Sequence, residues 1–163
     1  MARKNVKSAF PAPNHNHDRC TLTAMKKAEA VCRAGGKRLT EIRKRVLEAV
    51  WESHAPIGAY DILAKLNKGD GRIAPMAVYR ALEFLMENGL VHRIASLNAF
   101  VGCTHPDTEH AAGFLICREC GCTAELDSDS LNDALDTAVA ARGFKVDKQV
   151  LELSGTCPHC GGE

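Results

Sequence analysis

Apolar residues recur at intervals of three and four in three successive segments of the first half of the chain. The first segment follows Thr40, a suitable helix-capping residue, and the second follows Gly58. The third begins at Pro75, which suits a first helical position, and ends before Gly89. This spacing predicts three amphipathic helices. Their expected buried faces comprise Ile42, Val46, Ala49 and Val50; Ile62, Leu63 and Leu66; and Val78, Ala81, Leu82 and Leu85.

Two short stretches, LVHRIA and AFVGC, follow the third helix and are joined at residues 96–98. They predict a β-hairpin. Three helices followed by a hairpin are the pattern of a winged helix-turn-helix, in which the last helix enters the major groove of DNA. A further helical stretch precedes them, from Thr21 to about Arg33, and ends at two glycines.

The rest of the chain predicts a smaller α+β unit. HAAGFLIC, GCTAEL and FKVDKQVLELSG are strand-like, and Ser128 suits the cap of a helix that runs to Arg142. Such a unit has too few apolar residues to be robust alone, so we expect a metal and a partner subunit to stabilise it. The expected inner face of its helix comprises Leu131, Leu135, Ala138 and Val139.

The expected fold class is therefore α+β, with a winged helix-turn-helix domain and a small dimerisation domain. Residues 1–19 are polar and lack periodicity, which predicts a disordered arm. The DNA-binding domain is expected at residues 20–103, with a hinge at its C-terminal end. The metal-binding dimerisation domain is expected at residues 104–163.

The net charge of +1 conceals a division of charge between the two halves. Residues 1–102 carry 17 lysines and arginines against 9 acidic residues, whereas residues 103–163 carry 4 against 11. A basic half favours a polyanionic partner, here double-stranded DNA. No apolar run is long enough to span a bilayer and no secretory signal is visible, so we expect a cytoplasmic protein without a membrane partner.

Two C-x2-C pairs carry the strongest chemical signal. Cys117 with Cys120 and Cys157 with Cys160 each offer two thiolates at the spacing of a tetrahedral metal site. We expect a closed, structural Zn²⁺ site, although the spacing also admits rubredoxin-like iron and disulfides remain the alternative. Cys122 is expected to be a free or partly buried thiol.

A second ligand set has mixed chemistry. His92, Cys103, His110 and Glu125 offer nitrogen, sulfur and oxygen atoms that suit Zn²⁺, and His105 is a local rival. His92 and Cys103 belong to the expected DNA-binding domain and the other two to the second unit. A metal bound by all four would fix the angle between the domains.

The remaining cysteines and histidines at the start of the chain are not expected to form a metal site. Cys20 and Cys32 lack partners at ligand spacing, and we expect them to pack as small residues in the first helical stretch. His15 and His17 are expected to be solvated residues of the arm, with adventitious metal uptake as the alternative.

Two side chains are expected to face DNA. Arg80 lies opposite the apolar face of the third helix, where a guanidinium can donate two hydrogen bonds to guanine. Tyr60 points away from the core face of the preceding helix and can reach a phosphate or a thymine methyl group.

The ordered set LTEIRKRVLEAV, AYDIL, AVYRALEFLMENGLVHRI, FLICRECG and CPHC resembles the ferric uptake regulator superfamily, most closely its zinc uptake regulator branch. The resemblance covers about residues 39–160. It implies a structural zinc on the four paired cysteines and a regulatory zinc on His92, Cys103, His110 and Glu125, two zinc ions per chain in all. It also implies DNA contacts from Tyr60 and Arg80.

Two departures from the family pattern matter. Iron-sensing members carry a histidine-rich run before the first C-x2-C pair, where this chain has TEHAAGFLIC, which argues against iron. Members also commonly carry threonine at the position of Ala77, so one phosphate contact is in doubt.

These observations predict a zinc-responsive transcriptional repressor that binds operator DNA as a zinc-loaded homodimer and controls zinc uptake genes. It is not expected to be an enzyme or to bind a small-molecule substrate. The alternatives are a peroxide- or other metal-responsive regulator of the same superfamily, and a zinc hydrolase with Glu125 as general base.

Overall fold

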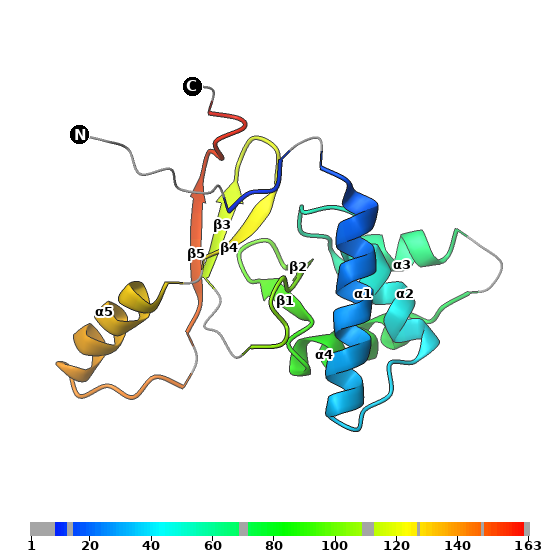
Figure 1. The fold of residues 1–163 in the computed structure, drawn as a ribbon, viewed down its shortest axis with the longest axis horizontal. Coiled ribbons are helices and arrows are strands. Elements are labelled where there is room, and N and C mark those ends of the chain that lie inside the picture. The colour runs from blue at the N-terminus through cyan, green and yellow to red at the C-terminus, as the bar shows by residue number, and fades with distance from the viewer. Residues whose placement is uncertain are drawn as a thin grey trace.

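The computed structural model describes residues 9–12, 15–68, 72–108, 113–126, 128–147 and 149–161. Helices form one side of the molecule and a small sheet with one helix forms the other, with a two-stranded hairpin between them (Figure 1). No helix among the described residues is long and apolar enough to cross a membrane.

The helical unit has the predicted order of elements. Each predicted apolar face is found on the core side, with Leu63 and Ile42 partly buried and the others buried. The third predicted helix begins at Pro75 and is followed by Gly89 at φ +65°, as its end signals indicate. The elements are α1 (His17–Ala34), α2 (Glu41–Val50), α3 (Ala59–Leu66), α4 (Pro75–Glu87), β1 (Val91–Ile94) and β2 (Ala99–Gly102).

The second unit is a three-stranded sheet with one helix. The strands lie in the order β4-β3-β5, with β3 antiparallel to β4 and parallel to β5. The elements are β3 (Gly113–Cys117), β4 (Thr123–Leu126), α5 (Asp129–Ala140) and β5 (Leu151–Gly155). Together the two units confirm the predicted α+β class with its winged-helix domain.

Three local expectations differ from the structure. Helix α1 begins at His17 rather than Thr21, because the side chain of Asn16 accepts a hydrogen bond from the Arg19 amide and caps the helix inside the stretch predicted as a disordered arm. No residue of helix α5 is fully buried within the described chain, and Leu131, Leu135 and Val139 of its predicted inner face are only partly buried. The last strand is confined to Leu151–Gly155.

The two units meet along the hairpin. Ile94 and Val101 of the hairpin form a buried cluster with Phe114 and Ile116 of β3. At the hairpin turn, the amides of Ala95 and Ser96 donate to the carboxylate of Glu152 in β5, at 2.6 and 3.1 Å. The Thr123 amide of β4 donates to the carbonyl of His54, in the loop after α2, at 2.9 Å. The junction therefore combines apolar packing with directed hydrogen bonds.

Candidate metal centres and DNA-facing residues

The structure brings the sulfur atoms of Cys117, Cys120, Cys157 and Cys160 within 4.8 Å of one another. Parallel pairing of β3 with β5 explains this, because Cys117 lies opposite Gly155 and the second pair follows two residues later. The first pair is closed by a turn in which Gly121 adopts φ +74°, a conformation that favours glycine. Sheet register and turn geometry therefore position both pairs.

The four sulfurs fit a tetrahedral metal. Cys120 Sγ and Cys157 Sγ are 3.9 Å apart, and zinc–sulfur bonds of about 2.3 Å would place tetrahedral sulfurs about 3.8 Å apart. Backbone amides that include those of Cys120 and Cys157 donate to the Cys117 sulfur and lower the pKa of Cys117 to about 6, which favours the thiolate that metals bind. Burial raises the pKa of Cys122, outside this group, to about 11.

A second group contains side chains from both units. His92 lies in β1, Cys103 follows β2, and Glu125 lies in β4, and their ligand atoms are within 4.8 Å of one another. The His92 Nε2 to Glu125 Oε1 distance is 4.0 Å. The fourth expected ligand, His110, lies outside the described residues.

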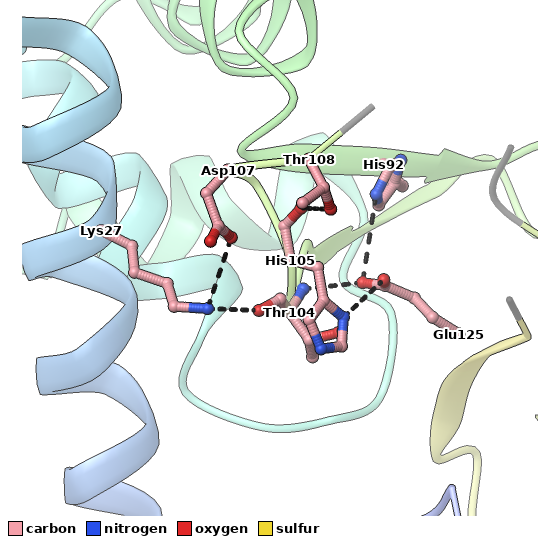
Figure 2. A network of polar contacts seen from close by, with 7 residues as sticks. All are labelled: Lys27, His92, Thr104, His105, Asp107, Thr108 and Glu125. Atoms are coloured by element: carbon pink, nitrogen blue, oxygen red, sulfur yellow. Dashed lines mark hydrogen bonds and ion pairs between the residues drawn. The ribbon is translucent and has the colours of Figure 1, made fainter. Parts of the chain in front are cut away.

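Polar contacts hold Glu125 at this junction (Figure 2). The Thr104 amide donates to Glu125 Oε1 at 2.7 Å, and His105 Nδ1 lies 3.9 Å from Glu125 Oε2. Lys27 of α1 donates to the Thr104 carbonyl at 2.9 Å, so the segment after Cys103 is also tied to the first helix. His105 is outside the group whose ligand atoms converge.

The charges of the group His92, Cys103 and Glu125 favour a bound cation. Cys103 is only 3% exposed, and its burial, followed by the charge of Glu125, raises the pKa of its thiol to about 12. A thiol beside a carboxylate in a buried place gives up its proton when a positive ion offsets the two negative charges. Nitrogen, sulfur and oxygen donors of this kind suit Zn²⁺.

Both residues expected to contact DNA are exposed on the helical unit. Tyr60 in α3 is 76% exposed, and Arg80 projects from α4 on the side opposite its buried face. Tyr79 is also exposed, and the pKa of its hydroxyl is raised by partial burial and by the adjacent Tyr60. Tyr79 was not predicted, although its position beside Arg80 was a usable signal.

One group of ligand-type side chains was missed. His15 and His17 are half-buried rather than solvated, and they converge with Cys20 and His54. Cys32 is buried in the helical core as expected. The pattern H-x-H-x2-C was visible in the sequence, but its fourth member comes from 34 residues beyond Cys20.

The sequence model of the Ferric uptake regulator family matches residues 34–154. The chain belongs to the ferric uptake regulator family. It is 35% identical over 141 residues to the zinc uptake regulation protein of Escherichia coli, covering 86% of this chain and 82% of that protein. This is a family of transcriptional regulators and not of enzymes, so the hydrolase alternative is rejected.

Solved structures of the family differ in how closely they match this chain. A zinc uptake regulator complexed with zinc and DNA matches with a TM-score of 0.80 at 34% identity, covering 86% of this chain and 95% of that one. Holo XcZur matches with a TM-score of 0.77 at 39% identity, covering 85% and 97%. Apo XcZur, at the same identity and covering 87% and 98%, gives only 0.52. The arrangement seen here is therefore closer to the holo form than to the apo form.

Proposed function

We propose that this chain is a zinc-responsive transcriptional repressor that binds operator DNA as a zinc-loaded homodimer and controls genes of zinc uptake. The observation that carries the proposal is the group His92, Cys103 and Glu125, which joins the DNA-binding unit to the second unit. The similarity to zinc uptake regulators supports the choice of zinc. We also propose that the protein acts in the cytoplasm, where its DNA partner is found.

Two zinc sites per chain are proposed. The closed set of Cys117, Cys120, Cys157 and Cys160 offers four sulfurs and no open position, which suits a permanent structural ion. The regulatory set is His92, Cys103, His110 and Glu125. Its donors come from separate elements, so an ion there supplies a crosslink between the units.

The regulatory set acts through its effect on the hairpin. His92 lies within β1 and Cys103 directly after β2, so both strands of the hairpin are tied to the site. Without an offsetting positive charge, burial and the neighbouring Glu125 carboxylate disfavour the ionised form of the Cys103 thiol. Moving the units from 1% to 99% in one arrangement needs about 5.5 kcal/mol of differential binding.

DNA recognition is assigned to the exposed face of α3 and α4. We propose that the exposed Arg80 donates two hydrogen bonds to a guanine edge in the major groove. Tyr60 is placed to contact a phosphate or a thymine methyl group. The domain limits proposed are 20–103 for the DNA-binding domain, which helix α1 extends back to His17, and 104–163 for the dimerisation domain.

Dimerisation is assigned to the second unit. No residue of its helix α5 is fully buried in one subunit, and the larger apolar side chains of α5, Leu131, Leu135 and Val139, are only partly buried. A two-fold dimer built on this unit would present two DNA-binding units to a palindromic operator. The large exposed apolar residues of this unit are Phe144, Val146, Val150 and Leu153.

Fluorescence anisotropy in buffered free zinc tests the proposal, with duplexes selected from a random library as the DNA. Wild-type protein is expected to bind the selected DNA only above a threshold of free zinc. Glu125→Ala should lose this dependence together with one zinc per chain. Glu48→Ala, an exposed substitution on α2 away from the ligand sets, should retain both. Zinc-independent binding by the wild-type protein would contradict the sensor function.

A further inference from the structure

A third group of potential ligands lies at the start of α1. His15 precedes the helix, His17 and Cys20 lie in its first turn, and His54 lies in the loop after α2. The ligand atoms of all four are within 4.8 Å of one another, and all four residues are half-buried. None of them takes part in the two zinc sites described above.

Backbone carbonyls fix the orientation of two of the rings. His15 Nδ1 lies 2.6 Å from the carbonyl oxygen of Ala12, and His17 Nε2 lies 2.6 Å from that of Trp51. A carbonyl oxygen only accepts hydrogen bonds, so each of these ring nitrogens carries the proton in the neutral imidazole. In that tautomer the opposite nitrogens, His15 Nε2 and His17 Nδ1, are the acceptors.

These two acceptors face each other. His15 Nε2 lies 3.3 Å from His17 Nδ1 and 2.9 Å from His54 Nε2. The three rings pack against one another, with centroids 4.8–5.4 Å apart, so His54 Nε2 faces the same small space. One proton on His54 Nε2 can satisfy only one of the two facing lone pairs, whereas a cation between the rings satisfies all of them.

The spacing and the surroundings match a zinc site. Zinc–nitrogen bonds of about 2.0–2.1 Å place the nitrogens of a tetrahedral site about 3.3 Å apart. Histidine ligands usually donate their other ring N–H to a backbone carbonyl or carboxylate, which is the arrangement of His15 and His17 here. Cys20 lies on the same face of the helix as His17, three residues on.

We propose that His15, His17, Cys20 and His54 bind a third Zn²⁺ ion. Three imidazoles and one thiolate favour this borderline metal over Mg²⁺ or Ca²⁺, which prefer oxygen ligands. The inference does not rest on the proposed function, because it follows from geometry outside both sites that the function uses.

The site lies where it can strengthen the junction of the two units. The carbonyl of His54 accepts from the Thr123 amide of the second unit, at 2.9 Å. A cavity of about 470 Å³ is lined by three of the proposed ligands and also by Cys103 of the regulatory set. A metal here would tie the start of α1 to the loop that contacts β4, beside the sensor.

Metal counting on the full chain tests the site. Wild-type protein dialysed against buffered zinc is expected to hold three zinc ions per chain by mass spectrometry under native conditions. The variant His15→Ala/His54→Ala should hold two. Thr23→Ala is the matched control, because Thr23 lines the same cavity without offering a strong ligand, and it should hold three. An unchanged count in the double variant would overturn the proposal.

Cobalt provides the second readout. A Cys103→Ser background is used, with zinc retained on the four paired cysteines, so that Cys20 is the proposed source of any thiolate-to-Co²⁺ charge-transfer band. This band is expected in the background and should disappear when Cys20→Ser is added. A band that survives Cys20→Ser, or no band in the background, would contradict the site. Because neither readout uses DNA, failure here is distinguishable from failure of the repressor function.

Loss of folding would not imitate the expected result. His15→Ala alone, which changes a residue before the helix begins, should also remove one zinc while leaving the helical circular dichroism unchanged. A correctly folded His15→Ala protein that retained three zinc ions would overturn the assignment of His15.

Discussion

The two units of this regulator are held together by different forces. The helical unit has a contiguous apolar core that includes α1, α2, α3, α4 and part of the hairpin. In the second unit, no described residue of α5 is fully buried. The main apolar cluster there includes Ile94 and Val101 of the hairpin. The contrast predicts that hydrophobic burial alone can maintain the DNA-binding unit, whereas we expect the second unit to depend on the proposed metal ligation and on a partner subunit.

The largest effect is expected from removing the structural ligands. Cys117→Ser should release the metal and unfold the second unit, because metal binding to such sites contributes on the order of 10 kcal/mol to folding. Hydrogen exchange should show lost protection in β3, β4 and β5 and retained protection in α2 and α4. Cys122→Ser, outside the ligand set, should leave the hydrogen-exchange protection of both units unchanged. Equal loss of protection in both units of the Cys117→Ser variant would show that they do not differ in their dependence on metal.

Truncating a core side chain should instead destabilise the helical unit. Leu85 in α4 is fully buried, and Leu85→Ala should lower the free energy of unfolding of the helical unit by about 2–5 kcal/mol through lost burial and a cavity. Chemical denaturation monitored by Trp51 fluorescence measures this change. Leu22→Ala, at a residue that is 62% exposed, should have little effect.

Substitutions on the exposed face of α4 should change DNA affinity without changing the stability of the fold. Arg80→Ala should weaken binding to selected operator DNA by about 1–3 kcal/mol, since one bidentate base contact is lost. Arg142→Ala, an exposed arginine of the second unit, should leave the affinity unchanged. Anisotropy titrations at fixed salt compare the two, and equal losses would indicate nonspecific charge effects.

The smallest effect concerns the hydrogen bonds between the units. The Ser96 hydroxyl, with the amides of Ala95 and Ser96, lowers the pKa of Glu152. Because the folded pKa lies below 4.5, this contact contributes fully above that pH and is lost as pH falls through the lowered value. Glu152→Gln should weaken the junction by about 1–2 kcal/mol near neutral pH. Because glutamine does not titrate, the hydrogen-exchange protection of the hairpin amides should then change less as the pH is lowered.

Local patterns predicted most of the fold. The apolar spacing of residues 41–50, 59–66 and 75–87, with Pro75 and Gly89 at the ends of the last, predicted three helices within one or two residues. The paired cysteines were predicted to be neighbours, and the structure places them together because the chain is constrained there by two tight turns and one strand pair.

What could not be predicted depends on contacts between distant segments. His54 joins His15 across 39 residues, and no local periodicity indicates such a meeting. The cap at Asn16 was readable in principle, but the polar stretch around it shows no helical period. The face of α5 was predicted as buried from its pattern, yet it is only partly buried in one subunit, and the pattern does not say what covers it.

Strand β4 starts just after the first cysteine pair, and Glu125 follows Cys120 by only five residues. The position of the Glu125 carboxylate should therefore depend on the ion proposed to bind the four paired cysteines. This creates a hierarchy of dependence: emptying the sensor should leave the four-cysteine site loaded, but stripping the four-cysteine site should disable the sensor as well.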